Sequence, residues 1–215
     1  MSPPTRRVLG GWLVYRFRLP MGQRLLRLFP GLILFGVGMG MAVDATLGVS
    51  PWTVFHGGVA DLVGLSIGTI VVLTGVAIVL LFRPLNEPLG LGTLGNTLLI
   101  GPALDLTRAI IPDTELLWVR WPLLLAAPVV IGLASGLYIG SGLGPGPRDG
   151  IMTAISRRGV TTWKARTGIE LTALSIGWLL GGDVGFGTVY MALAVGPAVQ
   201  FFLPMLSIAD RAPDD

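Results

Sequence analysis

The sequence contains no cysteine and a single histidine, His56. Without cysteine the chain forms no disulfide, has no thiolate nucleophile and offers no sulfur ligand to a metal. One histidine leaves a zinc site built from this chain short of ligands, so we expect no metal and no cofactor. The Gly-x-x-x-x-Gly-Lys-Ser/Thr loop that cradles nucleotide phosphates is absent too. These absences argue against a thiol enzyme, a zinc enzyme and an ATP-driven pump.

Charged residues are also scarce. They make up 13% of the 215 residues, against 52% hydrophobic residues and a mean hydropathy of +0.76. A soluble domain has about 25% charged residues, so this chain has too few to cover a surface facing water. Glycine is abundant, with 32 residues, and small residues let membrane helices approach closely. The composition predicts an all-α, polytopic membrane protein whose surroundings are a lipid bilayer.

Eight apolar segments follow one another along the chain. They cover residues 28–43, 51–63, 67–82, 91–111, 121–139, 147–156, 165–180 and 188–206. The second and sixth are short: about 13 residues reach only about 20 Å, less than the roughly 30 Å of the hydrocarbon core. We predict a bundle of about eight helices, flanked by a basic segment (1–27), divided by a polar linker (112–120) and closed by a polar tail (207–215).

The amino-terminal segment carries six arginines and no acid. A signal peptide is disfavoured, because Arg16 and Arg18 interrupt its apolar run. The positive-inside rule places this segment in the cytoplasm, with Trp12, Tyr15 and Phe17 at the lipid headgroups. Basic residues elsewhere cluster in a few loops, so membrane topology explains them better than a nucleic-acid partner.

A sequence pattern occurs twice. Residues 47–51 (Leu-Gly-Val-Ser-Pro) are repeated as residues 143–147 (Leu-Gly-Pro-Gly-Pro), 96 positions later, and Gly36 and Gly40 are repeated as Gly132 and Gly136 at the same separation. Residues 90–93 and 101–102 are repeated 95 positions later, as residues 185–188 and 196–197. Two long apolar copies are typical of the internal duplication of transporters. We therefore predict two four-helix repeats, residues 28–111 and 121–206.

Two topologies agree with such repeats. If the short segments cross the membrane, the chain has eight spans and the repeats are parallel. If they dip in and return, it has six spans and the repeats are inverted. Arg108 and Arg120 are cytoplasmic only in the first arrangement and Arg83 only in the second. The positive-inside rule then favours eight spans by two arginines to one.

The starts of the short segments are the candidate site. Pro51 and Pro147 suit the first position of a helix, and free N–H groups there attract an anion if they lie at membrane depth. Short, Gly/Pro-interrupted segments at equivalent places point to a transporter's site, although tight turns at the membrane surface would give the same pattern. The predicted substrate-binding residues are Ser50, Pro51, Trp52, Thr93, Gly146, Pro147, Arg148 and Thr188.

Four titratable residues within apolar segments are candidates for proton coupling: Asp149, Glu170, His56 and Asp105. Ionisable residues at membrane depth tend to be functional. Each has a structural alternative, which for Asp149 is a pair with Arg148 at the interface in a first helical turn. Arg166 at i−4 suits an ion pair with Glu170 and Arg108 at i+3 one with Asp105, while His56 suits a polar helix face. Asn96 and Gln200 suit hydrogen bonds between helices.

With residues 48–52 (Gly-Val-Ser-Pro-Trp), 90–93 and 142–150 (Gly-Leu-Gly-Pro-Gly-Pro-Arg-Asp-Gly) in view, the chain resembles the YczE-like bacterial membrane proteins, grouped with YyaS and YitT. The resemblance covers most of residues 28–206. It implies a multi-pass protein of the bacterial plasma membrane, and the family has no agreed substrate from which residue roles follow.

The leading hypothesis is a small secondary carrier for a small polar or anionic solute, with proton coupling as an option. The runner-up is a non-transporting scaffold or accessory subunit that assists a partner enzyme. An intramembrane enzyme is the weakest option, because Ser50 and His56 make no catalytic pair on spacing alone. So small a carrier leaves a homodimer open.

Overall fold

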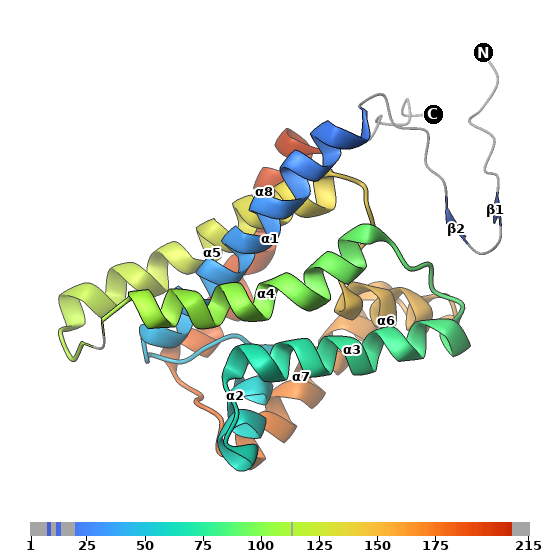
Figure 1. Cartoon of the computed structure of the whole chain (residues 1–215). Helices are drawn as coiled ribbons and strands as arrows, with labels where there is room; N and C mark the ends of the chain where they lie inside the picture. The colour runs from blue at the N-terminus through green and yellow to red at the C-terminus, as the bar shows by residue number, and fades with distance from the viewer. Residues whose placement is uncertain (1–7, 10–11, 14–19, 113, 208–215) are drawn as a thin grey trace.

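The computed structural model describes residues 8–9, 12–13, 20–112 and 114–207. The predicted roles of Tyr15, Phe17, the Trp12 side chain and the tail beyond Ser207 lie outside this part. Within these described residues the chain forms eight helices, with bounds α1 Met21–Asp44, α2 Pro51–Val63, α3 Ile67–Leu85, α4 Leu91–Ile110, α5 Leu117–Gly140, α6 Pro147–Ser156, α7 Thr162–Leu179 and α8 Phe186–Leu206. Two two-residue strands, β1 Val8–Leu9 and β2 Trp12–Leu13, precede them (Figure 1). The predicted helical class and count are confirmed.

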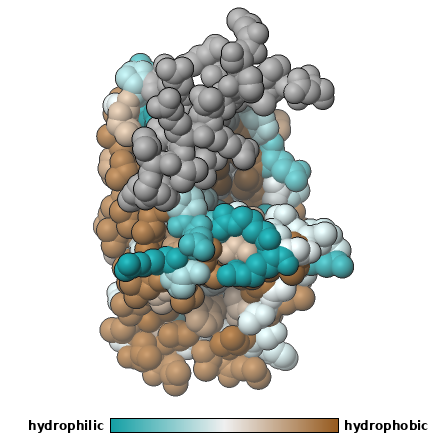
Figure 2. All heavy atoms as spheres, turned by 90° about the vertical axis from the view of Figure 1, so that its right-hand side faces the viewer, coloured by the Kyte–Doolittle hydropathy of each residue, from teal (hydrophilic) through white to brown (hydrophobic). Residues whose placement is uncertain are grey.

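Most helices present apolar side chains outward. Leu80 and Leu193 are each 71% exposed, and α1, α3, α5 and α8 are long and apolar enough to cross a membrane. Figure 2 shows one end of the molecule, where hydrophilic side chains form a band and hydrophobic ones cover much of the rest. An outer surface of this kind suits lipid rather than water.

Helices α1 and α5 form the central pair, and they run in opposite directions. A Cβ on Gly31 would lie 2.8 Å from the Tyr138 N atom, and one on Gly38 would lie 2.7 Å from the Ile131 side chain. As the residue number rises along α1, it falls along α5. Glycines at these positions let the two backbones approach.

The flanking helices α4 and α8 each run parallel to one member of this pair. Gly36 and Gly40 of α1 pack against Ile100 and Thr107 of α4. Gly132 and Gly140 of α5 pack against Ala198 and Leu206 of α8 in the same way. The four helices form one layer in the order α4–α1–α5–α8, and its core includes Leu28, Leu32, Ile100, Leu104, Leu124, Ile131 and Met191.

The short helices do not carry the chain across. The end of α1 (Gly40) and the start of α3 (Gly68) both lie beside the carboxyl-terminal half of α4, at Thr107 and Asp105, so α2 starts and finishes in one half of the molecule. At the opposite end, Gly92 N–H donates to Leu143 O after α5, and Arg157 after α6 reaches Asn86 O before α4. Helix α6 therefore turns back as well.

The parallel arrangement that the loop arginines favoured is wrong, because α1 and α5 are antiparallel. Arg120 donates to Ala45 O and Thr46 O, and Arg108 pairs with Asp44 at 3.1 Å. Both arginines lie at the end of α1, where their charge complements a helix carboxyl terminus and an acid. Helices α1 and α5 also begin earlier than predicted, because the first-turn arginines Arg24 and Arg120 find carbonyl partners across the pair.

Candidate functional site

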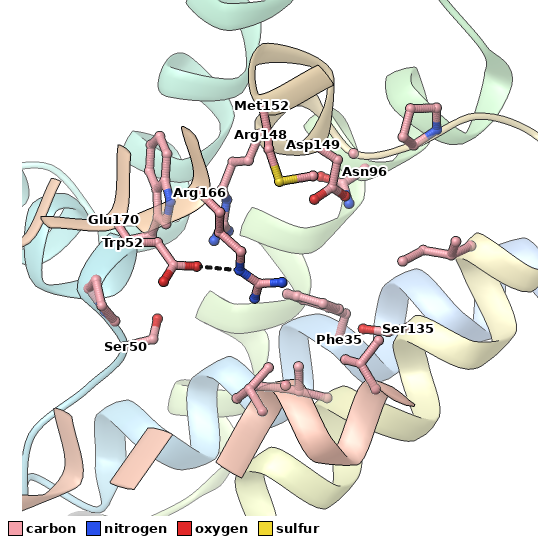
Figure 3. Close-up of a pocket in the computed structure, with 18 of the residues that line it drawn as sticks. Phe35, Ser50, Trp52, Asn96, Ser135, Arg148, Asp149, Met152, Arg166 and Glu170 are labelled. Carbon is pink, nitrogen blue, oxygen red and sulfur yellow. Dashed lines mark hydrogen bonds and ion pairs between the residues drawn. The ribbon is translucent and has the colours of Figure 1, made fainter. Parts of the chain in front are cut away.

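A cavity of about 410 Å³ lies between the starts of α2 and α6, helix α7 and the α1–α5–α8 wall (Figure 3). Eight of the twelve predicted site residues line it: Ser50, Pro51, Trp52, Gly146, Pro147, Arg148, Asp149 and Glu170. Both proline-led helix starts meet at this cavity.

Two backbone contacts hold these helix starts in the interior. Gly187 N–H donates to Leu47 O at 2.7 Å, and Gly92 N–H donates to Leu143 O at 2.7 Å. Each bond fastens the loop before a short helix to the start of α8 or α4. The prolines then begin α2 and α6 within the protein rather than at its surface.

Two arginines line the cavity, Arg148 and Arg166; Arg166 pairs with Glu170, and Arg148 is the other cation. Its guanidinium lies 5.1 Å from the centre of the Trp52 ring, and no hydrogen bond or ion pair joins it to the part of the chain that the structure describes. A guanidinium carries five donors in a planar fork, and leaving them unpaired away from bulk water is costly. The arrangement is suited to an anionic partner that enters the cavity.

Two acids line the cavity. Glu170 accepts from Arg166 at 3.0 Å, the i,i+4 pair that the sequence offered as a structural alternative. Asp149 lies in the first turn of α6, where a carboxylate is favourable beside the free N–H groups of a helix start. The Arg166–Glu170 pair leaves Arg148 as the arginine of the cavity without an ion pair among the described residues.

The cavity has two unlike walls. Helices α1, α5 and α8 supply an apolar wall that includes Phe35, Met39, Ile131, Met191, Val195 and Val199. The opposite wall, from α2, α6 and α7, carries the charged side chains (Figure 3). A ligand with one anionic end and one apolar end matches this division.

Four predicted site residues lie outside the cavity. Thr93 donates to Pro145 O at 2.8 Å, and Thr188 accepts from Gly185 N–H at 3.2 Å, so both hold the loops in shape. Asp105 accepts from Ser66 Oγ at 2.5 Å and from Gly68 N–H at 2.9 Å, which ties α3 to α4. His56 lines a smaller cavity instead.

That smaller cavity has a volume of about 20 Å³ and lies between α2, α3, α4 and α6. His56 is 2% exposed there, and its Nδ1 has no partner among the described residues. Thr74 and Thr97 also line it. A volume of this size holds about one water molecule.

The sequence reasoning missed several residues of the large cavity: Asn96, Ser135, Tyr138, Arg166 and Gln200. Asn96 and Gln200 stood out as polar residues in apolar segments but were assigned to helix contacts. Ser135 and Tyr138 gave no local signal. The described residues contain no group of three or more His, Cys, Asp or Glu side chains arranged to hold a metal ion.

These features define a polytopic helical membrane protein with a cavity that has one apolar and one charged wall. The chain belongs to the family described as "Family of unknown function (DUF6198)", which it matches over residues 22–204. It is 37% identical to an uncharacterized protein of Haemophilus influenzae over 85% of this chain and 84% of that one. It is 34% identical to the uncharacterized membrane protein YczE of Bacillus subtilis over 82% and 83%, and 24% identical to YyaS of the same organism over 82% and 90%. No solved structure matches the chain.

Proposed function

We propose that the protein is a small secondary carrier for a small organic anion. The observation that supports this most directly is Arg148, whose guanidinium has no hydrogen bond or ion pair within the described residues and lines a 410 Å³ cavity where two short helices begin. The proposal commits Arg148 to the anionic group of the solute. Ser50 and the backbone at Gly146 lie within the same cavity to complete its coordination.

Electrostatics favour an anion at this place. The first turns of α2 and α6 present N–H groups without helical partners, which carry partial positive charge. Arg148 adds a full charge to the same spot, and a guanidinium matches a carboxylate or sulfonate through paired N–H donors. The cavity volume falls within the roughly 300–1,000 Å³ of small-molecule sites, and its apolar wall suits a compact apolar body.

The arrangement of the helices supports a carrier. Helices α1 and α4 run together in one direction, and α5 and α8 run together in the other. This is the relation expected of two copies turned over within the membrane, the inverted repeats of many secondary carriers. Such carriers bind solute where interrupted helices meet between the copies. We infer the same duplication here, with residues 28–111 and 121–206 as the two copies.

Charge separates between the two ends of the molecule. Among the described residues, one end carries Arg24, Arg27, Arg83, Arg157, Arg158 and Lys164 with one acid, Glu87. The other end carries Asp44, Asp61, Asp105, Glu115 and Asp183 with Arg108 and Arg120. By the positive-inside rule we expect the basic end to face the cytoplasm. We therefore propose a bacterial plasma-membrane protein with a cytoplasmic amino terminus.

Transport is testable in proteoliposomes with a permanently charged probe. We expect saturable uptake of benzenesulfonate and none of phenyltrimethylammonium, which has a similar shape and the opposite charge. Arg148→Gln should reduce uptake at least tenfold, because it removes the cation that binds the sulfonate. Arg83→Gln, an exposed arginine away from the cavity, is the matched control.

Two results would contradict the proposal. Equal uptake by wild type and Arg148→Gln would remove Arg148 from anion recognition. Neither binding nor uptake of any small organic anion by folded protein would instead favour the scaffold, the other candidate.

A further inference from the structure

The two copies differ at one seam. Helix α3 packs along α4, and a Cβ on Gly101 would lie 2.2 Å from Gly68 O. The equivalent glycine 95 positions later is Gly196, where an added Cβ meets nothing within 4 Å. In the described structure, α7 does not pack along α8 as α3 packs along α4. The α3–α4 seam is closed and the α7–α8 seam is open.

The burial of α4 and α8 also differs between the two seams. Helix α4 has buried residues from Gly92 to Thr107, whereas the buried residues of α8 are confined to its beginning, at Gly187, Thr188 and Met191. Thr97 is 4% exposed, while Ala192, at the equivalent position, is exposed. The large cavity adjoins the open seam and the 20 Å³ cavity adjoins the closed one.

Four residues line both cavities: Trp52, Asn96, Pro147 and Arg148. The candidate anion-binding group therefore stands between an open compartment and a collapsed one. The collapsed compartment has its own polar groups, the His56 imidazole and the Thr74 and Thr97 hydroxyls. No carboxylate lines it in the described structure, so its chemistry suits the same anionic group.

One acid ties together the two helices of the closed seam. Asp105 on α4 accepts from Ser66 Oγ and Gly68 N–H at the start of α3; we call these three residues the α3–α4 latch. The position equivalent to Asp105 is Gln200, which lines the large cavity instead of bonding α7. Hydrogen bonds to a carboxylate are roughly twice as strong as neutral ones, so the latch favours closure of the α3–α4 seam.

We infer that the collapsed compartment is a second position for the solute anion, reached from the opposite side of the membrane. In that second state the α3–α4 seam opens, the α7–α8 seam closes, and Arg148 faces His56, Thr74 and Thr97. Inverted copies place equivalent seams toward opposite sides, which gives alternating access around a fixed cation. The identity of the ligand rests on the proposed function, whereas the exchange of seams rests only on the inferred duplication.

A matched pair of single cysteines tests the exchange, because the natural chain has none. Ala192→Cys reports on the open seam and Thr97→Cys on the closed one. In the wild-type background, a membrane-impermeant thiol reagent should label Ala192→Cys from one side of the membrane. It should label Thr97→Cys at a rate at least tenfold lower. Adding Asp105→Asn should raise the labelling rate of Thr97→Cys about tenfold from the other side and lower that of Ala192→Cys. Asp61→Asn, an exposed acid at the end of α2, is the control that should change neither rate.

The outcomes separate the two proposals. If Asp105→Asn leaves both rates unchanged, or if both cysteines react from the same side, the second compartment is wrong whatever the solute. The elution volume in detergent shows that the Asp105→Asn protein is folded, which both labelling results require. Asp105→Glu should restore the wild-type labelling rates at both cysteines. If the seams exchange but benzenesulfonate neither binds nor alters the rates, the exchange stands and the organic-anion carrier fails.

Discussion

Arg24 and Arg120 make reciprocal contacts, each from the start of one helix of the α1–α5 pair to the end of the other. Arg24, in the first turn of α1, donates to Ser141 O and Gly142 O after α5, at 2.9 and 2.7 Å. Arg120, in the first turn of α5, donates to Ala45 O and Thr46 O after α1, at 2.8 and 2.7 Å. Each arginine satisfies carbonyls that a helix end leaves without partners. The two contacts fix α1 and α5 as an antiparallel pair.

These contacts give the first prediction. Arg24→Gln and Arg120→Gln should each lower the free energy of unfolding by about 1.5–3 kcal/mol, because each removes hydrogen bonds from a charged donor. The thermal midpoint in detergent should fall by an amount on the order of 5 °C. Arg83→Gln should change it little. A large loss for one arginine and none for the other would contradict the reciprocal role.

The second prediction concerns membrane orientation. Val160→Cys, in the turn between α6 and α7, and Glu115→Cys, in the turn before α5, lie at opposite ends of the molecule and are exposed. In intact cells an impermeant thiol reagent should label Glu115→Cys and spare Val160→Cys. Val160→Cys should react once the cells are opened. Labelling of both in intact cells would overturn the six-span arrangement.

The third prediction concerns close packing between α3 and α6. A Cβ on Gly150 would lie 2.2 Å from the Phe82 ring, which is fully buried. Gly150→Ala should therefore cost about 1–3 kcal/mol through overpacking, and Phe82→Leu in the same chain should recover part of the loss. Gly57→Ala is the control: nothing lies within 4 Å of its added Cβ, so it should gain up to about 1 kcal/mol. Equal effects at both glycines would contradict the packing argument.

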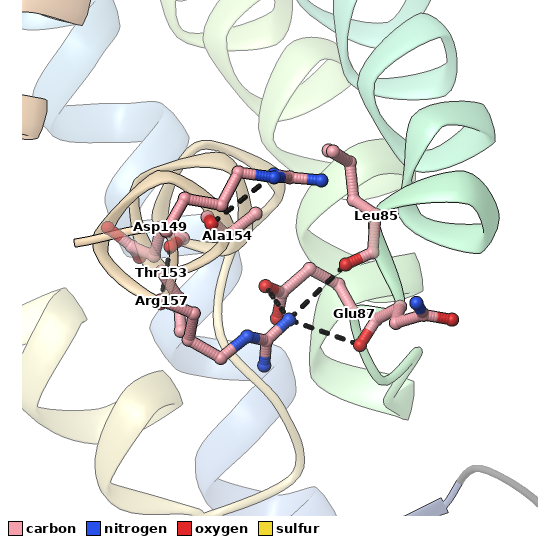
Figure 4. Close-up of polar contacts among 8 residues, drawn as sticks. Leu85, Glu87, Asp149, Thr153, Ala154 and Arg157 are labelled. Atoms are coloured by element: carbon pink, nitrogen blue, oxygen red, sulfur yellow. Dashed lines mark hydrogen bonds and ion pairs between the residues drawn. The ribbon is translucent and has the colours of Figure 1, made fainter. Parts of the chain in front are cut away.

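The fourth prediction is a pH dependence at the turn before α4 (Figure 4). Burial raises the pKa of the Glu87 carboxyl, whose side chain is 4% exposed, and the Arg157 guanidinium that pairs with it opposes this rise. A raised pKa means that the folded protein favours the protonated acid, so the free energy of unfolding increases as the pH falls through that pKa. Arg157→Gln removes the opposing charge and should raise the pKa further.

Thermal midpoints at two pH values test this. Arg157→Gln should destabilise the protein more at pH 8 than at pH 5, because only the charged carboxylate needs the guanidinium. The double variant with Glu87→Gln should lose that difference. A loss of the same size at both pH values would show that Arg157 acts through the Leu85 and Asn86 carbonyls alone.

The fifth prediction concerns Trp52, whose ring lies against the Arg148 guanidinium. Such a contact contributes about 0.5–1 kcal/mol and holds the cation in place. Trp52→Ala should weaken benzenesulfonate binding about two- to fivefold, and Trp52→Phe should weaken it less. Calorimetric titration in detergent measures both. Unchanged affinity in Trp52→Ala would separate the ring from anion binding.

Local sequence signals predicted the helices well. Pro51 and Pro147 stand at the first positions of α2 and α6, and both short helices have the predicted bounds. A proline favours a helix start through its own backbone, and an apolar segment favours the membrane through its own contact with lipid. Neither preference depends on residues far away in the chain. The meeting of the two helix starts at one cavity followed from the repeated pattern.

Contacts between residues far apart in the chain could not be predicted from the sequence. Arg108 and Arg120 suggested the wrong topology, because only folding brings them to Asp44 and the end of α1. Asn96 and Gln200 were predicted to form hydrogen bonds between helices. In the structure both line the cavity.

The sequence by itself determined a membrane protein of eight helices with two short, proline-led ones at matching places, because composition and backbone preference are local properties. The tertiary structure alone decided that α1 and α5 are antiparallel, that Arg148 has no hydrogen bond or ion pair within the described residues, and that Asp105 ties the start of α3 to α4. Those features depend on which surfaces pack together across about a hundred residues, and no local property of the sequence sets that choice.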